Sequence, residues 1–129
     1  EVLALTYQTR ELLPEVTLSV TVPHILTLDK QVQLAEELVQ AGADIIQTEG
    51  GINTKPAHGG TVGLIEKAAP TLAAAYEISR AVAIPVLCAS GISNVTAPLA
   101  TAAGAAGVGV GSAINQLNSE IAMIAAVRG

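Results

Sequence analysis

Glu49 and His24 each follow an apolar run that is typical of a β-strand. Glu49 closes the run ADIIQTE, and His24 comes directly after VTVP. A carboxylate at the C-terminal end of a strand can serve as a general base, and an imidazole as a general acid or a ligand for a substrate oxygen. We predict both as catalytic residues and expect partial burial to raise the pKa of Glu49. The alternatives are a carboxylate that bonds loop amides and a turn histidine held by nearby backbone.

Two loops that contain glycine, ASGIS at 89–93 and GVGVGSA at 107–113, carry no charged residue. Glycine has no Cβ, so its backbone N–H group can approach an anion closely, and free N–H groups at the start of a short helix favour phosphate. We predict phosphate binding, mainly by backbone amides, at Gly91, Ile92, Gly109, Gly111, Ser112 and Ala113. The alternative, which we prefer for Gly104 and Gly107, is that glycine only permits close packing of a helix on a strand.

Other reactive residue types have weaker support. His58 and Lys55 lie in the loop NTKPAHGG, which would be either a lid or simply mobile surface. The two histidines and Glu49 lack the regular spacing of a metal site, so we predict no metal. Cys88 lies in an apolar strand and is expected to be a small buried side chain.

The positions of the lysines argue against one class of chemistry within these residues. Schiff-base aldolases and thiazole synthase need a lysine at a strand end. No lysine ends a predicted strand here, and Lys30 and Lys67 are predicted on solvated helix surfaces. A Schiff-base lysine would therefore have to lie in another part of a longer protein.

Composition limits the fold and the partners. The chain has 129 residues, 50% of them hydrophobic, and its only aromatic residues are two tyrosines. The core must come from Ala, Val, Ile and Leu, which suits helices packed on a buried parallel sheet. The net charge of −5 offers no basic surface, so we predict no nucleic acid and no membrane partner. A single cysteine excludes an internal disulfide and favours a reducing compartment.

Hydrophobic periodicity and turn residues predict an alternation of helices and strands. We expect strands over 17–22, 43–49, 85–89 and 106–113. We expect helices over 2–13, 27–42, 64–82, 94–104 and 118–129. The third helix is predicted to be interrupted at Pro70, the fourth to be capped by Ser93 or Asn94, and the last by Asn118 or Ser119.

This α/β order requires parallel strands with right-handed crossovers, in either a doubly wound sheet or a (βα)8 TIM barrel. A dinucleotide-binding sheet would place its glycines after the first strand, but here they follow the last two, as in barrel phosphate sites. We predict four consecutive parallel βα units, the C-terminal half (strands five to eight) of a TIM barrel, with residues 1–129 part of a longer single-domain protein. The other half or a second copy would cover the two exposed sheet edges.

Four phrases support this expectation: LSVTVPH, QVQLAEELVQAGADIIQTEGG, GLIEKAAPTLAAAYEISRAVAIPVLCASGIS and AAGAAGVGVGSAINQLNSEIAMIAAVR. They resemble the uncharacterised family of cyanobacteria and algal plastids known as hypothetical chloroplast reading frame twenty-three. The resemblance covers nearly the whole chain and implies the C-terminal half of a protein roughly twice as long. That family is similar to phosphate-binding aldolase-type barrels such as thiazole synthase and the ribulose-phosphate-binding group.

We therefore expect a phosphate-binding barrel enzyme that acts on a small phosphorylated metabolite as an isomerase, lyase or synthase. The alternatives are a non-catalytic regulatory protein that binds a phosphometabolite or a flavin phosphate, and a structural subunit. The residues specify no cofactor, although flavin mononucleotide (FMN) could place its phosphate at the same glycines. The resemblance implies the cyanobacterial cytoplasm or the plastid stroma.

Overall fold

A computed structural model describes residues 1–50 and 54–129, in which helices and strands alternate. The helices are α1 (Val2–Leu12), α2 (Leu28–Gln40), α3 (Gly60–Ala81), α4 (Ala97–Ala103), α5 (Ser112–Asn115) and α6 (Glu120–Arg128). The strands are β1 (Ser19–Thr21), β2 (Ile45–Gln47), β3 (Val86–Ala89) and β4 (Gly107–Gly109). Within the described ranges, no helix is both long and apolar enough to cross a membrane.

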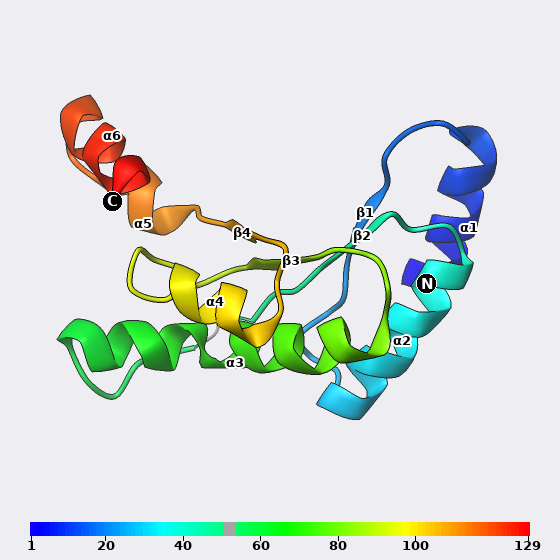
Figure 1. Cartoon of the computed structure of the whole chain (residues 1–129), viewed down its shortest axis with the longest axis horizontal. Coiled ribbons are helices and arrows are strands. Elements are labelled where there is room, and N and C mark those ends of the chain that lie inside the picture. The colour runs from blue at the N-terminus through cyan, green and yellow to red at the C-terminus, as the bar shows by residue number, and fades with distance from the viewer. Residues whose placement is uncertain (51–53) are drawn as a thin grey trace.

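The four strands form one parallel sheet in the order β1-β2-β3-β4 (Figure 1). Each strand is joined to the next by a helix, as parallel neighbours require. This confirms the prediction of four consecutive parallel βα units, the arrangement found in one half of a (βα)8 barrel. Because the strands are parallel, the loops that follow them gather at the C-terminal ends of the strands, which we call the mouth.

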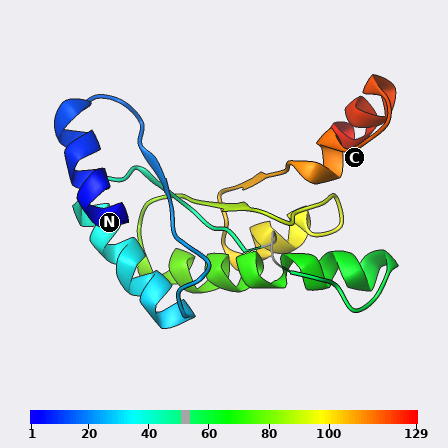
Figure 2. The same ribbon diagram turned by 180° about the vertical axis from the view of Figure 1, so that it is seen from behind.

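The core lies between one face of the sheet and α2, α3 and α4, which Figures 1 and 2 show on the same side. Val20, Ile46 and Val86 are paired in register and share this face. The helices contribute small side chains, including Ala74 and Ala75 of α3, which are completely buried. A core built largely of alanine lets the helices approach the sheet closely.

The opposite face of the sheet, the inner face, has small side chains near the mouth. Gln47 is paired with Leu87, and Leu87 with Gly107. A Cβ on Gly109 would lie 2.9 Å from the Cβ of Ala89, so these two positions face each other closely on the inner face. Their lack of bulk leaves a hollow where the loops after β2, β3 and β4 meet.

Arg10 of α1 binds the segments at the N-terminal ends of the strands, opposite the mouth. Its guanidinium donates hydrogen bonds to the carbonyl of Gly42 and to the carboxylate of Asp44, which also accepts the N–H of Leu18 at 2.8 Å. Further bonds reach the carbonyls at 13, 14 and 16. The Leu18 amide and then Arg10 lower the pKa of Asp44. This network fastens the first helix to the starts of β1 and β2.

The helix boundaries differ most from the predicted ones in α3 and α4. α3 begins at Gly60, not at residue 64, and continues through Pro70 without interruption, because the residues around the proline, Ala68 and Thr71, are fully buried against the sheet. α4 begins at Ala97 because Thr96 and Ser93 form a separate turn, in which the Ser93 N–H donates to Thr96 Oγ1 at 2.9 Å.

The N-cap of α4 is therefore Thr96 and not Ser93 or Asn94. The predicted cap of the last helix is confirmed at Ser119, whose hydroxyl accepts the N–H of Ala122 at 3.1 Å. The last strand is shorter than predicted and ends at Gly109, since the chain enters α5 three residues later.

Candidate functional site

His24 and Glu49 lie side by side at the mouth. The register that pairs Thr21 with Gln47 brings the residues after β1 next to those after β2. Glu49 Oε1 accepts the backbone N–H of His24 at 2.9 Å and lies 2.8 Å from its ring Nδ1. About a quarter to a third of each side chain is exposed, 26% for His24 and 31% for Glu49. The structure thus brings the two predicted catalytic residues into direct contact.

The pKa of Glu49 moves in the opposite direction to the prediction. Burial raises it, but the hydrogen bonds from His24 to the carboxylate outweigh burial, and the pKa lies below its ordinary value. Glu49 is therefore ionised at neutral pH and is a weak base. An ionised carboxylate beside Nδ1 holds the proton on that nitrogen and fixes the ring, the arrangement that orients a catalytic histidine. In this pair His24 is the better candidate for proton transfer, and Glu49 positions it.

The pair makes a testable contribution to acid stability. The pKa of Glu49 is lower in the folded chain, so the ionised carboxylate stabilises the fold above the ordinary glutamate pKa of about 4.3. That contribution is lost as the pH falls through the lowered folded value. We expect Glu49→Gln to make stability less dependent on pH between about 5 and 3. Urea unfolding across this range measures it, with Glu36→Gln on the exposed surface of α2 as control. Equal acid sensitivity of Glu49→Gln and the wild type would contradict it.

A cavity of about 580 Å³ opens at the mouth, between the loops after β3 and β4. Five of the six predicted phosphate-binding residues line it: Gly91, Ile92, Gly109, Gly111 and Ser112. Ala113 does not, because the turn into α5 directs it to a neighbouring groove. The remaining lining residues are Gln47, Thr54, Lys67, Ala89, Ser90 and Val110. The loops after β3 and β4 therefore face each other across one hollow, whereas His24 and Glu49 stand outside its lining.

The loop after β3 makes an unusual turn at the cavity wall. Ser90 and Gly91 both have left-handed backbone, with φ of 78° and 77°. A residue with a Cβ is strained there by about 1–2 kcal/mol, and such strain concentrates at functional sites. The two consecutive left-handed residues turn the chain sharply where it borders the cavity. The letters SG of ASGIS are the only sequence signal of this turn.

Two buried threonine hydroxyls support this turn from the side of α3. Thr71 of α3 donates to the carbonyl of Ala89 at 2.5 Å, and its hydroxyl lies 2.6 Å from that of Thr48. Both threonines are completely buried. Ala89 precedes the strained Ser90, and Thr48 precedes Glu49. A single helix side chain thus ties the end of β2 to the end of β3, directly beneath both parts of the candidate site.

A folded segment places Thr54 and Lys67 at the cavity. Glu66 of α3 accepts the N–H of Ala57 at 2.8 Å with one carboxylate oxygen and lies 2.7 Å from His58 Nδ1 with the other. This holds the segment 54–58 against the start of α3. His58 is therefore occupied with Glu66 and lies outside the cavity lining. Lys67 lies on the surface of α3, as predicted, and is partly buried; because α3 extends to the mouth, Lys67 also lines the cavity.

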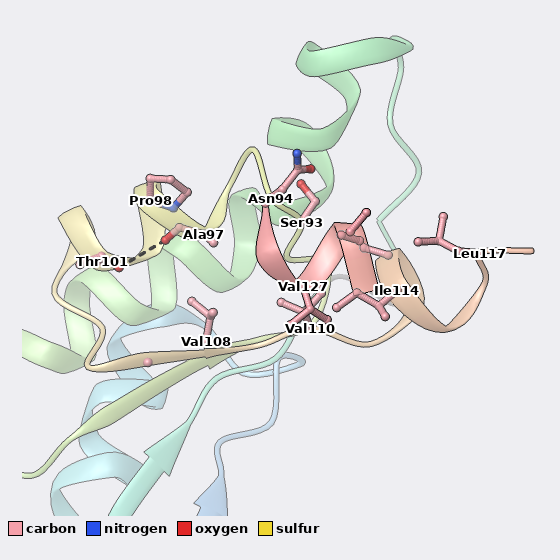
Figure 3. Close-up of a pocket in the computed structure, with 15 residues that line it drawn as sticks. Ser93, Asn94, Ala97, Pro98, Thr101, Val108, Val110, Ile114, Leu117 and Val127 are labelled. Carbon is pink, nitrogen blue, oxygen red and sulfur yellow. Dashed lines mark hydrogen bonds between the residues drawn. The ribbon is translucent and has the colours of Figure 1, made fainter. Parts of the chain in front are cut away.

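A second, larger hollow of about 740 Å³ lies between α4, β4 and the last two helices. Figure 3 shows Val110, Ile114 and Val127 gathered on one side of it, with Pro98 and Thr101 of α4 on another. Its lining is mainly apolar and includes no titratable side chain. This groove lacks the groups that acid–base chemistry needs.

The remaining reactive residue types are engaged in packing. Cys88 is fully buried, and burial raises the pKa of its thiol, which keeps it protonated. This agrees with the prediction of a small core side chain. Over residues 1–50 and 54–129, no group of three or more His, Cys, Asp or Glu side chains is placed to hold a metal ion.

Comparison with known proteins places the chain in a family. A family model described as "Protein of unknown function (DUF561)" matches residues 1–129. The chain belongs to the DUF561 family. "Uncharacterized protein ycf23" of Cyanophora paradoxa is 45% identical over 124 residues, and the protein of that name from Pyropia yezoensis is 41% identical over 124 residues. These matches confirm the resemblance to reading frame twenty-three.

The DUF561 relatives are longer than this chain. The two alignments cover 96% of the chain but 51% and 45% of the relatives, so the chain spans about half the length of the relatives it matches. Within this half, glycine patterns and strand ends were sufficient to find the two loops and the His24–Glu49 pair. Sequence reasoning missed Lys67, Thr71 and Ser90, whose places depend on how α3 packs over the sheet.

Proposed function

We propose that this DUF561 chain forms the phosphate-binding part of a barrel enzyme that acts on a small phosphorylated metabolite. The observation that carries the proposal is the cavity between the loops after β3 and β4, where a left-handed turn and glycine backbone border one hollow. Backbone N–H groups and the Ser112 hydroxyl would bind the phosphate. His24, oriented by Glu49, stands two strands away at the same mouth and would transfer a proton at the reactive end of the ligand.

The reaction we propose is an isomerisation, a bond cleavage of the lyase type or a bond formation of the synthase type, at a carbon near the phosphate. These reactions need proton transfer next to an oriented substrate, which a histidine fixed by a carboxylate can supply. Phosphate binding would provide the energy that holds the substrate over His24. The complete protein would be a closed (βα)8 barrel, with its other four units completing the mouth. We place it in the cyanobacterial cytoplasm or the plastid stroma.

A second candidate function is non-catalytic binding of a phosphometabolite or of FMN, with control of a partner protein. It is favoured by one observation, namely that His24 and Glu49 are absent from the cavity lining. FMN carries the same phosphate group and could use the same loops. A regulatory binder would need the cavity but not the histidine.

The two functions are separated by substituting the pair and leaving the cavity intact. Mass spectrometry of what co-purifies with the protein identifies the metabolite, and turnover is then followed with it. His24→Ala is expected to slow turnover by about a hundredfold to ten-thousandfold while binding persists, because the proton-transfer group is lost. Glu49→Gln is expected to slow it less. If neither variant changes a measured conversion, the residues are not catalytic. If the ligand is bound but never converted, the regulatory function is supported.

A further inference from the structure

We propose that Lys67 makes the mouth cavity selective for the dianion of a phosphate monoester. This inference deepens the proposed function and rests on it. Lys67 belongs to α3, far in sequence from the two glycine loops, yet it lines the same cavity as Gly91 and Ser112. The inference concerns the charge of the ligand, which backbone amides alone do not determine.

Among the described lining residues, Lys67 alone is charged. The other ten lining residues are uncharged, and four of them, Gln47, Thr54, Ser90 and Ser112, carry polar side chains. The described lining includes no carboxylate. The cavity is therefore a positive site in a chain whose net charge is −5. An anion would be repelled by most of this surface and attracted to this hollow.

The nearest acidic residue in sequence does not neutralise Lys67. Glu66 uses both carboxylate oxygens on the segment 54–58, one for the N–H of Ala57 and the other for His58. Across the described ranges, Lys67 has no hydrogen bond or ion pair to another protein group. Lys67 is partly buried, and its charge is available to a ligand.

The remaining donors determine which anion is preferred. A phosphate monoester carries a charge of about −1.5 to −2 at neutral pH and has three terminal oxygens. A diester carries one charge and has two such oxygens. The Coulomb energy with one ammonium group grows with ligand charge, and a third oxygen can accept a further bond from the hydroxyl, amide and backbone donors. Lysine acts as a point charge, so the rest of the ligand stays free to turn toward His24.

Binding of two small probes tests the inference on the whole chain. Methyl phosphate represents the monoester and dimethyl phosphate the diester, and calorimetry or NMR titration measures their affinities. The wild type is expected to prefer the monoester by about tenfold or more, given the strength of charge-assisted hydrogen bonds. Lys67→Gln is expected to weaken monoester binding by about tenfold to a hundredfold and to reduce this preference to within about threefold. Lys67→Arg is expected to restore much of the preference.

Lys30→Gln is the matched control. It removes the same charge from the exposed surface of α2, outside the cavity lining, and is expected to leave both affinities unchanged. Equal monoester binding by Lys67→Gln and the wild type would overturn the role of Lys67 and leave the phosphate site standing. Failure of the wild type to bind either probe would overturn the proposed function and this inference together.

Two candidate classes of ligand carry the same monoester, and the affinities of the wild type distinguish them. Glycerol 3-phosphate represents small metabolites, and FMN, followed by its absorbance, represents flavins. For whichever one binds, weaker binding by Lys67→Gln supports the role of Lys67, and unchanged binding opposes it. The ratio of the two wild-type affinities then shows which source the cavity takes.

Discussion

Replacing Thr71 by valine is expected to lower the free energy of unfolding by about 2–4 kcal/mol and to weaken phosphate binding as well. Valine has nearly the same shape but no hydroxyl. The carbonyl of Ala89 would lose the bond that Thr71 donates, and the fully buried Thr48 would lose its hydroxyl partner. Each unpaired buried group costs about 1–3 kcal/mol. The carbonyl of Ala89 immediately precedes the left-handed Ser90, so its release would also loosen the cavity wall.

Thr71→Ser provides the control, since it keeps the hydroxyl and removes only one methyl group. Urea unfolding measures stability, and titration with methyl phosphate measures the site. The serine variant is expected to recover most of the phosphate affinity even where it remains less stable. If the valine variant lost stability but bound phosphate as well as the wild type, Thr71 would be a packing residue without influence on the turn.

The second large effect on stability is expected at the N-terminal ends of the strands, opposite the mouth. Arg10→Ala should lower the free energy of unfolding by about 1.5–3 kcal/mol, because the part-buried guanidinium bonds to the carbonyl of Gly42 are lost. The exposed bond to Asp44 is left out of this figure, since water replaces it. The mouth lies at the far end of the strands, so phosphate affinity should stay within about twofold of the wild type.

Arg10→Lys is the informative companion to this change. It keeps the charge but cannot form the forked bonds of a guanidinium, so it should recover less than half of the lost stability. Urea unfolding and methyl phosphate titration check both expectations. A loss of phosphate affinity in Arg10→Ala under conditions where the chain remains folded would show that the two ends of the strands are coupled, contrary to this account.

The sequence was informative where local chemistry decides the structure. Alternating apolar runs and turn residues predicted four parallel βα units, and the position of the glycines after the last two strands predicted where the loops would meet. Strand ends also placed His24 and Glu49 at the mouth. These features depend on short-range patterns that tertiary packing did not override.

Other features depended on contacts between distant residues. The pKa of Glu49 was predicted to rise because burial can be anticipated from a strand end, whereas the lowering by the bonds from the His24 side chain and backbone cannot. Lys67 was predicted on a helix surface, but its place in the cavity lining could not be predicted, because a lone lysine on a helix has no pattern that indicates a cavity. Thr71 gave no signal either, since a threonine that supports a loop through its hydroxyl cannot be told in sequence from one that only packs in the core.

The alanine-rich core determines more than packing density. Ala74 and Ala75 are completely buried in α3, the helix whose Thr71 donates to the carbonyl of Ala89 in β3, and small side chains at these positions favour such a close approach. The volume of these side chains therefore influences the geometry of the mouth several residues away. Substitutions that enlarge them would move the helix away from the sheet and break the bond that supports the turn. Larger core side chains would therefore change ligand affinity before they unfolded the chain.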